Sequence, residues 1–111
     1  MKECIFCAIA SGEVPADVVA EGIDWLAFRD LDPKAPVHVL VIPREHVESL
    51  DELESAEDGS ALLGACRSVA AAAGVSGGYR VVTNVGRDGG QSVDHLHFHV
   101  LGGRQMGWPP G

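Results

Sequence analysis

Apolar residues along the 111-residue chain gather into short stretches that match strands in length and composition. Runs of roughly four to eight residues, rich in β-branched and aromatic side chains and bounded by Gly, Pro or Asp, are typical of strands. Runs of this kind predict five strands: Val18–Glu21, Trp25–Arg29, Val37–Ile42, Tyr79–Val85 and His95–Leu101. The third run is strongly apolar and is stopped by Pro43, because proline cannot donate to a sheet ladder.

Two other stretches have the spacing and end signals of helices. A short helix is predicted over Cys4–Ala10, and a long one begins at Ala56 or Asp58 and continues to Ala73. Gly74 suits the C-terminal cap of the long helix. Its apolar positions recur at helical spacing: Leu62, Leu63, Cys66, Val69, Ala70 and Ala73. Strands flanking one long helix, with connections of hairpin length, predict an α+β fold with an antiparallel sheet.

The last predicted strand alternates imidazoles with apolar side chains. Its histidines are His95, His97 and His99, and the residues between and after them are Leu96, Phe98 and Val100. Because side chains in a strand alternate between faces, the imidazoles should share one face, open to solvent and ligand, while the apolar row packs in the core. Such a face can be merely polar, can bind zinc, or can perform acid–base and nucleophilic chemistry.

A glycine-rich loop directly precedes the histidine row. Between Gly86 and Ser92 the sequence reads Gly-Arg-Asp-Gly-Gly-Gln-Ser. Its glycines can adopt conformations that direct backbone N–H groups into one concavity, which suits a phosphate oxygen, although an ordinary hairpin turn has the same composition. Next to an imidazole row and the Ser92 hydroxyl, the loop favours a phosphate site.

Composition and charge narrow the class of protein further. With 46% hydrophobic residues the chain is too apolar for disorder, yet no apolar run approaches the roughly 18 residues of a membrane helix. The length predicts a single domain over residues 1–111. Lys and Arg number 8 against 16 Asp and Glu, a net charge of −8, which opposes binding to DNA or RNA. A phosphorylated ligand would therefore be small and held locally.

The cysteines and the first residues predict a compartment. The chain has three cysteines, an odd number, and two of them form a Cys4-x-x-Cys7 unit. The stretch Met1–Cys7 lacks the apolar segment of a secretory signal. We therefore expect a cytoplasmic protein with reduced thiols rather than a disulfide scaffold.

The histidine row lies within a longer motif that resembles a known superfamily. His95–Leu101 is similar to the histidine triad signature, in which three histidines alternate with apolar residues before a final apolar pair. Gly89–His95, Gly102–Gly111, Phe28–Pro36 and Ile42–His46 resemble the Hint branch of that superfamily. Asp94 departs from the pattern, since relatives often carry an aromatic or apolar residue there.

This resemblance implies a fold and an activity. It implies a five-stranded antiparallel sheet with one long and one short helix, pairing into a homodimer with a continuous sheet. Members bind purine nucleoside monophosphates and cleave phosphoramidates or mixed anhydrides, such as aminoacyl-AMP, at the α-phosphorus. His97 would be the nucleophile that forms a nucleotidyl-histidine, His38 would orient its imidazole, and His99 would contact the phosphate and leaving group.

The resemblance also assigns residues to the substrate. Ser92 would guide the leaving-group proton, and Asn84 would bind the phosphoryl group, together with the loop around Gly90 and Gln91. Asp30 would accept from the ribose hydroxyls. Five apolar residues would enclose the base: Phe6, Ile9, Val14, Phe28 and Leu31. Each of these five could equally be an ordinary core residue. In the Hint branch the irregular tail that contains Trp108 borders the active site of the partner chain.

The Cys-x-x-Cys unit has three interpretations. Redox chemistry would need a thioredoxin-like unit, which the predicted elements lack, and two buried thiols without a function remain an alternative. Zinc-bearing histidine triad proteins combine such a pair with two histidines, which here are His46 and His95. The resemblance therefore implies a structural zinc site formed by Cys4, Cys7, His46 and His95. Cys66 is most simply a small core residue.

Two other functions stay open at this point. One is a nucleotide-binding regulatory module whose turnover is incidental. The other is a dinucleoside polyphosphate hydrolase, against which the tail argues, because a Pro-Arg typically follows the triad strand in that branch and Gly102–Trp108 has none.

Overall fold

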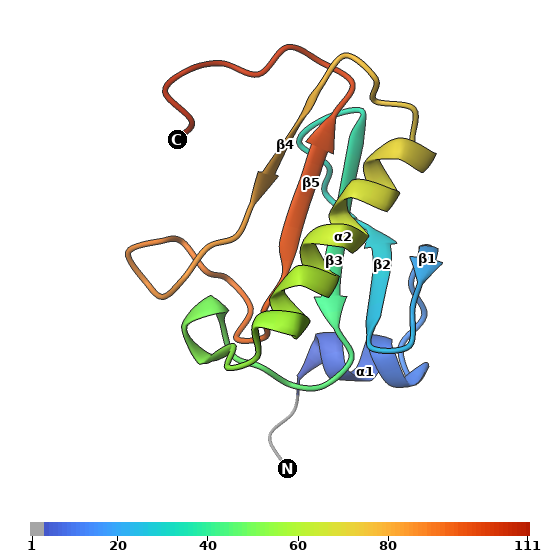
Figure 1. Ribbon diagram of the computed structural model, residues 1–111, viewed down its shortest axis with the longest axis vertical. Coiled ribbons are helices and arrows are strands. Elements are labelled where there is room, and N and C mark those ends of the chain that lie inside the picture. Colours follow the sequence, from blue (N-terminus) through green and yellow to red (C-terminus); the bar gives the residue numbers. More distant parts are fainter. Residues whose placement is uncertain (1–3) are drawn as a thin grey trace.

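Two helices, a short 3-10 turn and five strands make up residues 4–111, the part of the chain that this computed structural model describes (Figure 1). Residues 1–3, whose sequence entered the expectation about a secretory signal, lie outside it. The helices are α1 (Ile5–Ser11) and α2 (Ala56–Ala72), and the turn is η1 (Leu50–Glu52). The strands are β1 (Val18–Glu21), β2 (Trp25–Arg29), β3 (Val37–Pro43), β4 (Tyr79–Val82) and β5 (Phe98–Gly102). No helix within the described residues has the length and apolar character needed to cross a membrane.

The five strands form one antiparallel sheet in the order β1-β2-β3-β5-β4. The predicted α+β class with a five-stranded antiparallel sheet is thus confirmed. In the central pair, His38 lies opposite Leu101 and Leu40 lies opposite His99. Residues on a diagonal across an antiparallel pair share a face and lie within reach of long side chains. The register of β3 and β5 therefore brings His38 to His99.

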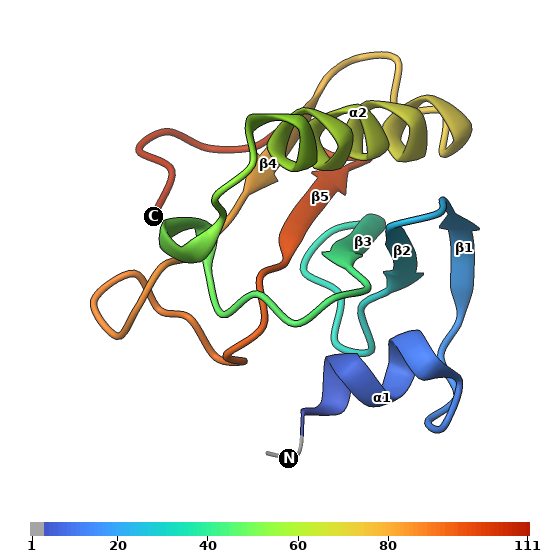
Figure 2. The same ribbon diagram turned by 60° about the horizontal axis from the view of Figure 1, so that its bottom comes forward.

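The two helices cover opposite faces of the sheet, as Figure 2 shows. The face under α2 is filled by small and branched side chains, including Val39, Val41 and Val100 of the sheet and Leu62 and Val69 of the helix. The other face holds a smaller cluster against α1: Phe6, Leu26, Phe28, Leu40 and Ile42. Alternate residues of β3 enter the two clusters, which explains why that strand is apolar at every position except His38.

Both helices begin at capping side chains. The Cys4 sulfur accepts from the backbone N–H of Cys7 at 3.3 Å, and the Ser55 hydroxyl accepts from that of Asp58 at 3.2 Å. The short helix ends at Gly12, whose φ of 87° only glycine adopts without strain. The predicted helices therefore match the observed ones to within a residue at each end, apart from the alternative start at Asp58.

The last two strands are shorter than predicted. β4 ends at Val82 rather than Val85, and β5 begins at Phe98 rather than His95. The backbone between them bonds outside the ladder, because the Leu96 N–H donates to the carbonyl of Val47 at 2.6 Å. The Thr83 hydroxyl likewise donates to the carbonyl of His97 at 2.8 Å. The apolar row is nevertheless buried as expected, at Leu96, Phe98 and Val100.

Candidate functional site

A cavity of about 290 Å³ opens between α1, the sheet and the segment before β5. Several predicted site residues line it: Phe6, Ile9, Val14, Phe28, Asp30, Leu31, Ser92, His97 and His99. The side chains from α1 and β2 make its walls apolar, whereas the histidines, Ser92 and Asp30 are polar. Leu31 is 98% exposed and therefore contributes only to the rim. The cavity has the mixed character of a small-molecule site, apolar with a few polar groups.

The imidazole of His97 is held by the backbone immediately before it. Its Nδ1 lies 2.7 Å from the carbonyl oxygen of His95. Since a carbonyl only accepts, Nδ1 carries a proton, and the neutral form of this ring has its lone pair on Nε2. The expectation that this ring faces solvent is wrong: His97 is 3% exposed, because the ring of Phe6 stands edge-on against it. Burial shields this ring from competing hydrogen bonds with water.

A second chain of hydrogen bonds fixes the protons of the other two histidines. The backbone N–H of Lys34 donates to Nδ1 of His38 at 3.0 Å, so the proton of a neutral His38 is on Nε2. That Nε2–H donates to Nδ1 of His99 at 2.9 Å. His99 must therefore carry its own proton on Nε2. The expectation that His38 orients His97 is corrected accordingly: the β3–β5 register places His38 beside His99, and the His95 carbonyl orients His97.

Burial keeps this pair of imidazoles neutral. It lowers the pKa of His99 to about 4, with further lowering by His97 and His38 and a partial offset by Asp30. Burial also lowers the pKa of His38, against the opposing effect of the Asp30 carboxylate, which lies 3.4 Å from its Nε2. Near neutral pH His38 and His99 therefore present neutral imidazoles with defined tautomers.

Together these tautomers create a reactive pair. His97 carries an unprotonated Nε2, and the neighbouring His99 carries an Nε2–H; their ring centroids lie 5.1 Å apart. One ring can act as nucleophile or base, while the other donates a hydrogen bond to an anionic group. Ser92 adds a hydroxyl at the same cavity.

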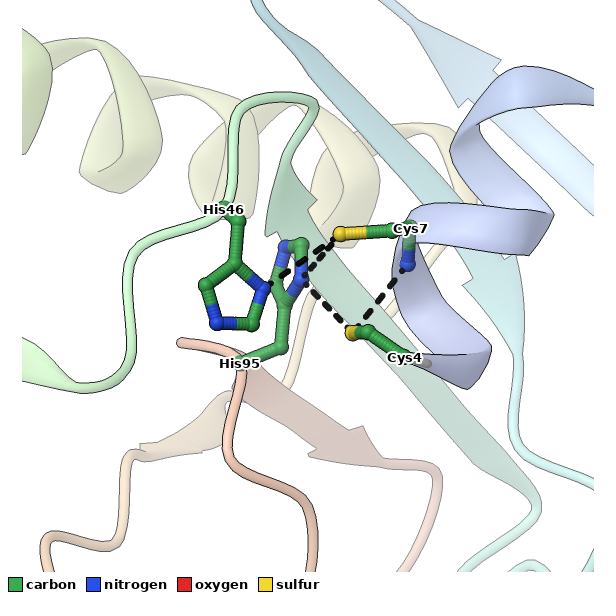
Figure 3. A group of neighbouring side chains, drawn as sticks. All are labelled: Cys4, Cys7, His46 and His95. Carbon is green, nitrogen blue, oxygen red and sulfur yellow. Dashed lines mark hydrogen bonds between the residues drawn. The ribbon is translucent and has the colours of Figure 1, made fainter. Parts of the chain in front are cut away.

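Four other predicted residues form a second cluster (Figure 3). Cys4 and Cys7 come from the start of α1, His46 from the loop after β3, and His95 from the segment before β5. Nδ1 of His95 lies 3.3 Å from the sulfur of Cys4 and 3.5 Å from that of Cys7. Nδ1 of His46 lies 3.3 Å from the sulfur of Cys7. The four donor atoms lie within 4.8 Å of one another, so this group could hold a metal ion.

The donors fit zinc in number, type and spacing. Two thiolates and two imidazoles form one of the usual tetrahedral sets, and at bond lengths of about 2.0–2.3 Å neighbouring ligand atoms lie roughly 3.5 Å apart. The Nε2–H of His95 donates to the carbonyl of Pro43 at 2.9 Å, which leaves its Nδ1 lone pair directed at the sulfurs. Burial, together with Cys4, raises the pKa of the Cys7 thiol, so binding a cation there would release a proton.

The glycine-rich loop does not form the predicted concavity at Gly90 and Gln91. The N–H of Gly90 donates to the carbonyl of Arg87, and that of Gln91 donates to the carbonyl of Gly86. Both groups close the turn itself and are unavailable to a phosphate. The Gln91 side chain also bonds Gly86, Glu48 and Val93, so it braces the loop next to Ser92.

Some contributors to the site gave no sequence signal. The backbone N–H of Lys34 and the carbonyl of Pro43 fix the His38 and His95 rings, but main-chain groups are the same in every residue.

Two predicted site residues lie away from the cavity. Asn84 follows β4 and lies outside the cavity lining. Trp108 is 83% exposed, in a tail tied to β4 by an Arg80 guanidinium bond to the Gly107 carbonyl at 2.7 Å.

Comparison with known families decides what this arrangement is. The HIT domain matches residues 11–106, which include the histidine row and most of the cavity. The chain belongs to the HIT family. This confirms the family part of the predicted resemblance, while assignment to the Hint branch stays a prediction.

Relatives of this HIT chain resemble it over nearly its whole length. An uncharacterized HIT-like protein of Synechococcus elongatus is 48% identical, with 99% of this chain and 98% of the relative covered. The crystal structure of a HIT family hydrolase from Legionella pneumophila superposes with a TM-score of 0.95 at 47% identity, covering 98% of this chain and all of that one. A histidine triad nucleotide-binding protein from Candida albicans gives a TM-score of 0.84 at 32% identity, covering 96% and 83%.

Proposed function

We propose that this protein hydrolyses purine nucleoside phosphoramidates or acyl-nucleotides, such as aminoacyl-AMP, at the α-phosphorus. The observation that carries the proposal is the pair of tautomers at the cavity, an Nε2 lone pair on His97 beside an Nε2–H on His99. Hydrolase activity is named for the Legionella pneumophila relative, and nucleotide binding for the one from Candida albicans. A hydrolase that acts on nucleotides by covalent catalysis needs a nucleotide pocket beside a nucleophile, and we propose that this cavity supplies both.

The cavity offers separate surfaces to the parts of a nucleotide. Its apolar walls from α1 and β2, with Phe6 and Phe28 at edge-to-face distance (centroids 5.6 Å apart), suit a flat purine ring. Asp30 stands beside these walls, where its carboxylate can accept from ribose hydroxyls. The α-phosphate then falls between this carboxylate and the histidines. We also propose that Asn84, which is not among the residues lining the cavity, hydrogen-bonds the phosphoryl oxygens of the bound substrate.

The reaction would proceed in two displacements. Nε2 of His97 attacks phosphorus, a P–N bond forms, and the bond from phosphorus to the leaving amine or carboxylate breaks. A leaving amine takes the proton of the Ser92 hydroxyl, which regains one from solvent, whereas a leaving carboxylate departs as the anion. The Nε2–H of His99 meanwhile bonds a phosphoryl oxygen. Water then attacks the phosphorus of nucleotidyl-His97, and the P–N bond breaks with its electron pair returning to Nε2. The proton of the water passes to solvent as AMP or its analogue is released.

We propose that the second cluster binds structural zinc in a cytoplasmic protein, where the thiols stay reduced. Cys4 and Cys7 of α1, His46 and His95 would be its ligands. When bound, the metal would cross-link α1 to the loop after β3 and to the segment before β5. Four protein ligands would fill every coordination position of the metal and leave none for substrate or water. The catalytic chemistry would therefore be performed by the chain's own residues.

We also propose that the protein is a homodimer of the Hint type, joined at β4. This strand lies at an edge of the sheet and exposes Tyr79 and Val81, which are 41% and 38% accessible. An apolar edge strand is a ready template for pairing with a second copy. The tail that carries the exposed indole of Trp108 is bonded to Arg80 of the same strand. In the dimer this indole would be covered at the partner's active site.

One other function has an observation in its favour. The Candida albicans relative is named for binding nucleotides, not for hydrolysing them. In a nucleotide-binding regulatory module the same pocket would hold AMP while turnover stayed incidental.

Turnover of adenosine phosphoramidate by the wild type and His97→Ala separates the two functions. We expect the variant to lose at least about a hundredfold in kcat, as removal of a nucleophile costs several kcal/mol of barrier. AMP binding should persist in the variant, with its fold checked by urea unfolding because His97 is buried. If the wild type turns over the substrate no faster than the variant does, the hydrolase proposal is wrong and the nucleotide-binding module is favoured.

A further inference from the structure

The side chain of Gln91 connects three segments beside the cavity. Its Nε2 donates to the carbonyl of Glu48 at 2.6 Å and to that of Val93 at 2.9 Å, and its Oε1 accepts from the N–H of Gly86 at 2.9 Å. These partners fix which end of the amide is which, because carbonyls only accept and an N–H only donates. The side-chain N–H groups of this half-buried residue are therefore bonded within the protein and unavailable to a substrate.

Ser92, which lines the cavity, lies inside the ring that one of these bonds closes. The bond from the Gln91 side chain to the Val93 carbonyl spans both peptide groups that flank Ser92, so it restricts the φ and ψ angles of that residue. Within residues 4–111 those two peptide groups make no main-chain hydrogen bond of their own. The Val93 side chain packs against the apolar cluster on the α1 side of the sheet. The direction of the Ser92 side chain therefore depends on the Gln91 amide and on that packing.

We propose that Gln91 is a positioning residue, which holds the Ser92 hydroxyl where it can protonate a leaving amine. As the bond from phosphorus to the amine nitrogen breaks, that nitrogen takes the hydroxyl proton, and the serine regains one from solvent. A leaving carboxylate departs as the anion and needs no proton. Gln91 thus affects turnover of phosphoramidates far more than turnover of acyl-nucleotides. This catalytic consequence rests on the proposed function, whereas the restraint on Ser92 does not.

Gln91→Glu removes the restraint with little change in shape. A carboxylate still accepts from the N–H of Gly86, but it has no proton to donate to the carbonyls of Glu48 and Val93. Arg87→Ala is the matched control, because the Arg87 side chain is 95% exposed on the same loop and lies outside the cavity lining. Its truncation changes the charge of the loop by the same amount. Circular dichroism and dispersed amide signals verify that both variants fold.

The restraint is measured without any substrate, from the 15N relaxation order parameter of the Ser92 backbone amide. A rigid backbone has an order parameter of about 0.85, and a flexible one falls below about 0.6. We expect the rigid value in the wild type and in Arg87→Ala, and the flexible value in Gln91→Glu. An order parameter that stays at the rigid value in Gln91→Glu would overturn the proposal.

The catalytic part is measured as kcat for two substrates, an adenosine phosphoramidate with an alkylamine leaving group and an aminoacyl-AMP. Ser92→Ala sets the full effect on the phosphoramidate, because a general acid contributes about a hundredfold or more. We expect Gln91→Glu to lose at least about tenfold on the phosphoramidate and less than about twofold on the aminoacyl-AMP. Added to Ser92→Ala, Gln91→Glu should cause no further loss, because it acts through the hydroxyl already removed.

Two other roles of Gln91 give a different result. A role in stability alone, or a direct contact with the substrate phosphate, would impair turnover of both substrates alike and would multiply with the effect of Ser92→Ala. That result would overturn the proposal. If the wild type turns over neither substrate while the order parameter of Ser92 falls in Gln91→Glu, the proposed function alone is wrong and the restraint stands.

Discussion

The ring of Phe6 stands edge-on to the ring of His97, with centroids 5.1 Å apart and planes at 83°. The same phenylalanine packs against Phe28 and His95, at 5.6 and 5.8 Å. A side chain from α1 thereby closes the cavity over His97 and also covers the ring of His95. The short helix is consequently part of the site, in addition to part of the core.

Phe6→Leu tests this arrangement. Leucine retains most of the buried apolar area but loses three edge-to-face contacts, each worth about 0.5–1.5 kcal/mol. We expect a loss of roughly 1.5–4.5 kcal/mol in unfolding free energy, measured by urea denaturation, and weaker AMP binding. Ile23→Ala is the control, because Ile23 is 92% exposed and lies outside the cavity. Equal effects of the two substitutions on AMP affinity would show that Phe6 has no part in the pocket.

The group formed by Cys4, Cys7, His46 and His95 makes a second prediction. Purified protein should contain about one zinc per chain, and Cys4→Ser should lower both the metal content and the melting temperature, because bonds formed only in the folded state add to folding free energy. Elemental analysis and thermal unfolding measure the two effects. Cys66→Ala should keep its zinc, since Cys66 is buried against the sheet on the α2 side. Wild type that takes up no zinc under reducing conditions would favour two metal-free thiols.

The histidine pKa values predict how stability depends on pH. In the folded state the pKa of His99 is about 4, below its usual value of about 6.5. As the pH falls through that window, the unfolded chain gains a proton that the folded chain does not, so unfolding free energy falls. The full contribution is present above about pH 6.5, and His38, whose pKa is also lowered, acts in the same direction.

Urea unfolding of the wild type and His99→Gln across this range isolates the effect. Both proteins carry the same carboxylates, which cancel in the comparison at each pH. We expect a shallower decline in the variant, by less than about 1.4 kcal/mol per pH unit because His99 is partly exposed. Parallel curves would mean that His99 titrates in the folded protein as it does in the unfolded chain.

Sequence patterns predicted the fold well because its signals are local. The apolar runs and the helical spacing of Leu62, Cys66 and Val69 each act over a few residues, and the elements they predict match the structure closely. The exceptions lie between β4 and β5. There Leu96 bonds the loop after β3, and a bond between residues that far apart leaves no periodic trace in either segment.

The identities of the candidate site residues were also readable, whereas their pairings were not. Alternation indicated that His95, His97 and His99 act together, yet the partner of His38 depends on the register of β3 against β5. The protons are fixed by the main-chain groups of Lys34 and His95, which any residue could supply. The loop glycines were misleading because their N–H groups close the turn.

Removal of residues 107–111 tests the tail. Trp108 has no core position, and in a dimer it would form a wall of the partner's leaving-group pocket. We expect kcat/KM to change unequally for aminoacyl-AMP and a simple alkyl phosphoramidate, with little change in stability. If the truncated protein is still dimeric and has the same selectivity between the two substrates as the full-length protein, the tail only covers surface and has no part in the leaving-group pocket.

The nucleophilic role of His97 is tested most directly by trapping its covalent intermediate. Wild-type protein is mixed with adenosine phosphoramidate labelled at phosphorus, quenched within one turnover, digested and analysed by mass spectrometry. The lone pair at Nε2 of His97 predicts a transient AMP adduct on that residue, forming and decaying at rates that account for kcat. An adduct on His99, or turnover with no adduct on His97 at any time, would contradict it.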